Sequence, residues 1–166
     1  MSFIQALGVF ISVIGAIQSD YKICKEKEIS FIEKVLSNKK TVGVVMDYCR
    51  RSYNSEMLLC AKDIDVFLTS RKKTTRLKIG EHIAHTYLRV NSPLELNISN
   101  ISVWFSDVSV ALAESNDDKV EEILQEVRIH CLHDLKEVIY RLCSINDQVL
   151  KVVTDHHKTQ KDLSLV

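Results

Sequence analysis

The chain has 166 residues, of which 46% are hydrophobic and 27% charged, values typical of one globular domain and not of a disordered segment. Its 22 basic and 22 acidic side chains cancel, so any attraction for nucleic acid or anionic lipid must come from a local patch. Four glycines and one proline are too few for the turns of a β-sandwich or barrel. We therefore predict an all-α fold, a single bundle of about five to six helices over residues 1–155, followed by a polar tail at 156–166.

The first segment, residues 1–19, contains no charged side chain. Two interpretations fit it: an apolar first helix or a secretory signal peptide. The length of the apolar run and the small Ser19 suit cleavage after that residue, whereas a signal peptide normally begins with basic side chains. As a first helix the segment could also enter a membrane, and the candidate inserting side chains are Phe3, Leu7, Phe10, Ile11, Ile14 and Ile17.

Helix-start signals and apolar spacing predict the elements that follow. Ser30 begins an S-x-x-E capping box, which predicts a short helix over 30–36. Apolar residues spaced near 3.6 predict a longer helix over 41–68. Further along, Ser92-Pro93 has the pattern of a cap followed by proline at the first helical position, which predicts another helix start.

Between two of these helices lies the one concentrated basic patch of the sequence. It contains no aromatic side chain on which a base could stack, so we predict no nucleic-acid partner. Basic side chains near an anionic membrane surface are each worth about 1 kcal/mol, which makes lipid headgroups a candidate ligand. The candidate headgroup contacts are Arg71, Lys72, Lys73, Arg76 and Lys78.

The clearest element is the last one. Apolar residues recur every three or four positions from Val120 to Val152, with one extra four-residue step near Cys131. Because no Gly or Pro interrupts this stripe, we predict one long C-terminal helix with Leu135, Leu142 and Ile145 in the core. The polar tail after it is expected to fray.

The sequence carries no catalytic signature. It has no nucleophile elbow, no P-loop, no glycine-rich dinucleotide fingerprint and no zinc-protease motif, so we predict neither enzymatic activity nor a cofactor. His82 and His85 are three residues apart, as are His130 and His133. Two such pairs could complete a metal site if their helices met, but solvated histidines are the more common outcome, and we predict no metal.

The cysteines and sequons depend on the compartment. Both Asn97 and Asn100 begin an Asn-x-Ser triplet, which is a glycosylation site only in a secreted chain. In a cytosolic chain the five cysteines would be reduced thiols, whereas a secreted chain would form two disulfides and keep one free thiol. The spacing of the five matches no zinc motif: Cys24, Cys49, Cys60, Cys131 and Cys143.

The sequence of residues 6–18 resembles the start of fungal HeLo and related helical cell-death domains. It reads Ala-Leu-Gly-Val-Phe-Ile-Ser-Val-Ile-Gly-Ala-Ile-Gln. The N-terminal bundle of the mixed-lineage kinase-like pseudokinases is similar in plan. This resemblance implies a bundle that oligomerises on a signal and disrupts a membrane through its first helix and basic residues.

Residues 30–100 also resemble a regulator of G-protein signalling. The resemblance is carried by the segment that begins at Tyr53 and ends with Pro-Leu-Glu-Leu-Asn at Asn97. The resemblance implies that Glu56 and Asn97 occupy two positions that steady the switch regions of a Gα subunit. The chain departs from that family where Met57 replaces an Asn and Ala61 replaces a core Trp. The family's usual Asp and Arg near the last helices are replaced at about His130 and Asp134.

Of these interpretations, our prediction is a non-enzymatic, cytoplasmic or membrane-associated bundle that acts by self-association and by contact with a protein partner or an anionic membrane. The alternatives are a secreted helical glycoprotein that has lost residues 1–19, and a Gα-binding domain.

Overall fold

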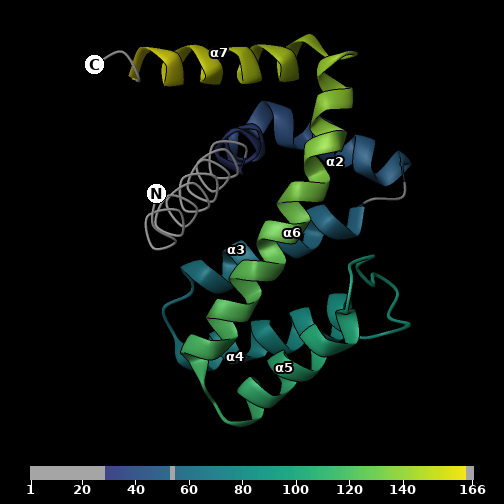
Figure 1. The fold of residues 1–166 in the computed structure, drawn as a ribbon, viewed down its shortest axis with the longest axis vertical. Helices are drawn as coiled ribbons and strands as arrows, with labels where there is room; N and C mark the ends of the chain where they lie inside the picture. Colours follow the sequence, from purple (N-terminus) through teal and green to yellow (C-terminus); the bar gives the residue numbers. More distant parts are fainter. Residues whose placement is uncertain (1–28, 53–54, 164–166) are drawn as a thin grey trace, which may run out of the picture.

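The computed structural model describes residues 29–52 and 55–163, the last eight as backbone only (Figure 1). Those residues form helices and loops without a strand, which confirms the all-α prediction. The helices are residues 29–37, α2 (Lys39–Arg51), α3 (Ser55–Thr69), α4 (Lys73–Ile83), the π-helical η1 (Ala84–Leu88), α5 (Ile101–Ala113), α6 (Asp117–Cys143) and α7 (Asp147–Leu163).

The long helix α6 is the centre of the bundle and runs along most of its length (Figure 1). It packs against α2, α3, α4, α5 and α7. The side chains that it buries recur every three or four residues, so the predicted stripe does face the core as far as residue 142. Its buried members are Val120, Leu124, Val127, Cys131, Leu135, Val138 and Leu142.

The predicted long helix is present as α6, but the prediction that the same helix continues to Val152 is wrong. The helix ends at Cys143, and α7 begins at Asp147 and leaves in a different direction (Figure 1). Asn146 causes the break, because its side-chain oxygen accepts hydrogen bonds from the backbone N–H groups of Gln148 (3.0 Å) and Val149 (3.2 Å) and so caps a new helix. As a result Ile145, predicted to be in the core, is 70% exposed.

Three other predicted helix boundaries are also wrong. The predicted helix over 41–68 is two helices, α2 and α3, and α2 begins after Asn38, whose side chain accepts from the N–H of Lys40 at 2.9 Å. Residue 29 is already helical, so Ser30 lies inside a helix and does not cap it. Ser92-Pro93 forms a turn in place of a helix start, because the Ser92 hydroxyl donates to the carbonyl of Thr86 at 2.8 Å.

The helix over residues 29–37 packs Phe31, Ile32 and Val35 into the core and is also held by an ion pair to Arg128. Arg128 of α6 pairs with Glu33 of that helix at 2.8 Å and with Asp65 of α3 at 2.6 Å. Beside this pair of contacts, the hydroxyl of buried Thr41 donates to the carbonyl of Val35, which joins the helix to α2.

The predictions for the two chain ends have different outcomes. The segment 1–19, with every candidate inserting side chain, lies outside the described residues. In the described part of the chain, no helix combines the length and apolarity needed to cross a bilayer. At the other end, α7 extends to Leu163 and so continues into the segment that we assigned to a polar tail.

Candidate functional site

One groove lies where three distant segments of the chain meet, and we call it the α3–α6 groove. It has a volume of about 620 Å³. Glu56 and Met57 line it from the first turn of α3, Asn97 from the loop before α5, and His133 and Asp134 from the second half of α6. Glu56 and Asn97, which the regulator resemblance assigns to Gα contact, therefore lie in one groove with Met57 and Asp134, where the chain departs from that family.

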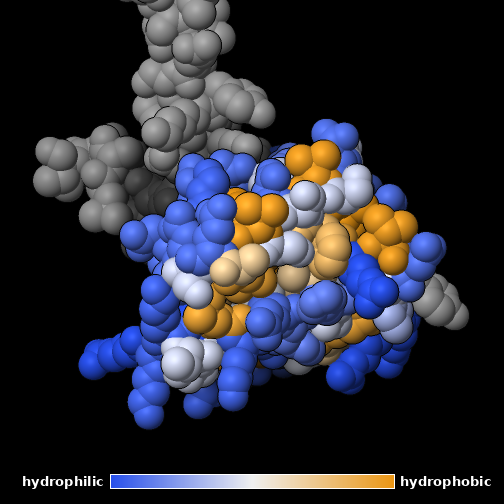
Figure 2. Space-filling model, turned by 90° about the horizontal axis from the view of Figure 1, so that it is seen from below, coloured by the Kyte–Doolittle hydropathy of each residue, from blue (hydrophilic) through white to orange (hydrophobic). Residues whose placement is uncertain are grey.

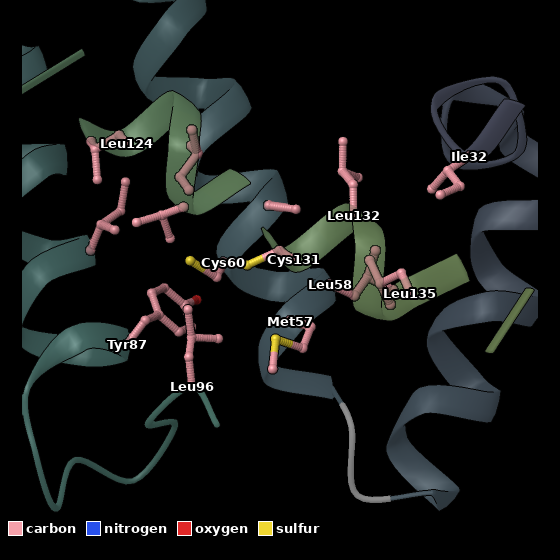
Figure 3. Close-up of a cluster of buried hydrophobic side chains, with 14 of the residues drawn as sticks. Ile32, Met57, Leu58, Cys60, Tyr87, Leu96, Leu124, Cys131, Leu132 and Leu135 are labelled. Atoms are coloured by element: carbon pink, nitrogen blue, oxygen red, sulfur yellow. The ribbon is translucent and has the colours of Figure 1, made fainter. Parts of the chain in front are cut away.

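The loop over 89–100 holds Asn97 in this groove because the residue before it is anchored. Leu96 is buried, and its N–H donates to the carbonyl of Tyr87 at 2.9 Å. Tyr87 in turn donates its hydroxyl to Asp63 of α3 at 2.7 Å. Figure 3 shows Tyr87 and Leu96 side by side in the buried cluster. Asn97 itself is exposed, so its amide is available to a partner.

The wall formed by α6 alternates between core and groove. Leu135 is buried, whereas His133 and Asp134 before it are exposed, and His133 Nδ1 lies 3.7 Å from Asp134 Oδ1. Met57 and Leu135, both buried and both labelled in Figure 3, also line the groove. The groove therefore offers carboxylates and an amide above an apolar floor, which is a surface suited to a protein loop.

The other end of the α6 wall carries residues that the sequence analysis did not single out. Glu137 forms an ion pair with Arg141, and Lys136 lies 5.9 Å from the ring centre of Tyr140. Glu137 and Arg141 lie about one and two turns beyond Asp134 on the same face of the helix. That spacing is the signal that could have found them.

One of the five predicted headgroup contacts is wrong. Arg71, Lys72, Lys73 and Lys78 are exposed, but Arg76 is only 8% exposed. Its guanidinium lies 4.3 Å from the ring centre of Phe67 and pairs with two carboxylates of α6, Asp117 at 2.8 Å and Glu121 at 2.6 Å. Because both carboxylates hold it against the core, Arg76 cannot reach a lipid headgroup.

The two histidine pairs face different neighbours. His82 lies 3.5 Å from Asp63, His85 packs edge-on against Phe105 at 5.6 Å, and His130 packs edge-on against Trp104 at 5.9 Å. No set of three or more potential metal ligands converges among the described residues.

The described cysteines are all free thiols: Cys49, Cys60, Cys131 and Cys143. Burial raises the pKa of Cys49 to about 11, and a hydrogen bond that the Cys60 thiol makes to Cys131, together with burial, raises the pKa of Cys60 well above its ordinary value. Cys60 of α3 and Cys131 of α6 lie next to each other in the core (Figure 3). Cys24 lies outside the described residues.

The two sequon asparagines differ in position. Both are exposed. Asn97 lines the α3–α6 groove, whereas Asn100 adopts a left-handed backbone conformation with φ 58° immediately before α5.

Comparison with protein-family models, with curated proteins and with solved structures found no match to this chain.

Proposed function

We propose that the chain is a non-enzymatic protein-recognition domain that binds a Gα subunit through the α3–α6 groove. The observation that carries this proposal is the meeting of Glu56 and Asn97 in that groove. They come from α3 and from the loop before α5, and the resemblance to regulators of G-protein signalling implies contacts with Gα at these two positions. Asp134 of α6 lies in the same groove, where the chain departs from that family's pattern.

The chemistry of the groove fits a protein loop. Glu56 and Asp134 provide charged acceptors and Asn97 provides both a donor and an acceptor, a combination that can bind the backbone and hydroxyl groups of a mobile loop. The buried Met57 supplies apolar contact where the family has an Asn, so this chain has one amide fewer for the partner. The proposed activity is accordingly binding.

The test is a binding titration against a panel of Gα subunits in the GDP, GDP–aluminium fluoride and non-hydrolysable GTP states. We expect preference for an activated state, and we expect Asn97→Ala to weaken binding about tenfold, as truncation of a central interface residue commonly does. Ser99→Ala is the matched control, because Ser99 is an exposed residue of the same loop that does not line the groove.

The outcomes separate this proposal from its alternatives. Equal affinity of Asn97→Ala and Ser99→Ala, or no binding to any Gα state, contradicts the proposal. The Ser99 control also removes the Asn97 sequon without changing the Asn97 side chain, so it distinguishes a lost contact from a lost glycan. The membrane-active alternative retains exposed Arg71, Lys72, Lys73 and Lys78, and co-sedimentation with anionic vesicles tests it in parallel.

A further inference from the structure

A second groove lies between α5 and the first half of α6, and we call it the indole groove. Its volume is about 250 Å³, below the range of about 300–1,000 Å³ that is common for small-molecule pockets, so it has room for about one long side chain. Trp104 and Asp107 line it from α5, and Lys119, Glu122 and Glu126 from α6. Figure 2 views the molecule from the end at which α5 lies and shows apolar patches among hydrophilic side chains.

The aromatic wall of the groove is partly open. Trp104 is half-buried. Its indole packs edge-on against the ring of His130 of α6, and the two ring centres are 5.9 Å apart. Among the described residues no acceptor takes a hydrogen bond from the indole N–H. An indole in this setting offers a face to a cation and a donor to a peptide carbonyl.

Three carboxylates, those of Asp107, Glu122 and Glu126, line the groove together with Lys119. Its ammonium lies 2.8 Å from Glu122, and the pKa of Lys119 is raised, first by that hydrogen bond and further by the negative charges of Glu126 and Asp107. Lys119 pairs with only one of the three carboxylates. Neither Asp107 nor Glu126 has an ion-pair partner within the described part of the chain, so the groove keeps a net negative charge.

We infer that the indole groove binds a lysine or arginine side chain from a basic peptide segment of a partner protein. The cation would lie against the Trp104 ring and pair with Asp107 and Glu126, while the indole N–H donates to the peptide backbone. An acidic peptide, a nucleic acid or an anionic lipid would meet repulsion at the same place. The inference uses different residues from the α3–α6 groove and stands whether or not the chain binds Gα.

The chain contains a single tryptophan, so the tryptophan fluorescence reports on this groove alone. The probe is an acetylated tetra-arginine amide, titrated at low ionic strength against the full chain, with tetra-glutamate as the charge-reversed comparison. We expect tetra-arginine to change the Trp104 emission with saturation and tetra-glutamate to leave it unchanged.

Variants with opposite expected signs make the test specific. Asp107→Asn and Glu126→Gln should each weaken tetra-arginine binding about three- to fivefold, the size of one partly screened ion pair. Lys119→Met should tighten it by a similar factor, because it removes the competing ammonium. Asp118→Asn is the matched control, since Asp118 is an exposed carboxylate of the same helix that does not line the groove, and it should change the affinity less than about twofold.

Three results would overturn the inference. The first is no saturable change with tetra-arginine at millimolar concentration, and the second is an equal response to tetra-glutamate. The third is a Lys119→Met variant that binds no more tightly than wild type while Asp107→Asn, Glu126→Gln and Asp118→Asn are indistinguishable. Far-ultraviolet circular dichroism of each variant verifies that the helices are retained.

Discussion

Leu142→Ala should lower the free energy of unfolding by about 2–5 kcal/mol, the cost of removing buried methyl groups and leaving a cavity. Leu142 is only 2% exposed in the last turn of α6. Ile145→Ala, three residues further along the same apolar stripe, should change it by less than about 0.5 kcal/mol, as exposed substitutions do. Urea denaturation followed by circular dichroism measures both values.

Leu135→Ala is the internal check on this prediction, because Leu135 is also buried on α6 and belongs to the same stripe. It should behave like Leu142→Ala. If Ile145→Ala cost as much as either leucine variant, Ile145 would be packed in the core, and α6 and α7 would have to be one continuous helix. That result would restore the prediction from periodicity and contradict the break at Asn146.

Arg76→Glu is expected to cost about 2–4 kcal/mol, toward the lower part of the range for breaking a buried ion pair, because the partner carboxylates are partly exposed. The substitution would bring a third negative charge beside Asp117 and Glu121 and remove the cation from the ring of Phe67. The midpoint of urea denaturation is the measurement, with an unchanged slope required for a simple loss of stability.

Lys78→Glu is the control, since it makes the same charge change on an exposed residue of the same helix. It should alter the free energy of unfolding by less than about 0.5 kcal/mol. Arg76→Met is a second variant that separates packing from ion pairing. Its apolar side chain of similar length keeps the packing over Phe67 while losing both ion pairs. Equal stability of Arg76→Glu and Lys78→Glu would mean that Arg76 is solvated and free to serve as a headgroup contact after all.

The fold class could be predicted from sequence because it depends on sums over the chain. Scarce glycine and proline, together with apolar spacing near 3.6, act over every helix, and one wrong boundary does not change the outcome. The boundaries depend on single side chains that have two good options. Asn146 could have been a helix-interior residue, and Ser92 could have been a helix cap, but each makes local hydrogen bonds that decide otherwise.

The burial of Arg76 could not be predicted for a different reason. Its partners, Asp117 and Glu121, lie 41 and 45 residues further along the chain, so nothing near Arg76 distinguishes it from Lys72 or Lys73. The α3–α6 groove could be predicted from the sequence only through a family resemblance that named Glu56 and Asn97. The indole groove had no such pattern, and its carboxylates meet only once α5 is packed on α6.

The break at Asn146 also divides the molecule into parts of unequal cooperativity. Among the side chains of α7 that the structure describes, those of residues 147–155, Val149 and Val153 are buried, whereas α6 buries ten side chains along its length. Elements with few buried contacts open at lower free energy than the core, and they do so as units bounded by loops. Amide protons of α7 should therefore exchange with solvent through an opening in which α6, and with it both grooves, keeps its native structure.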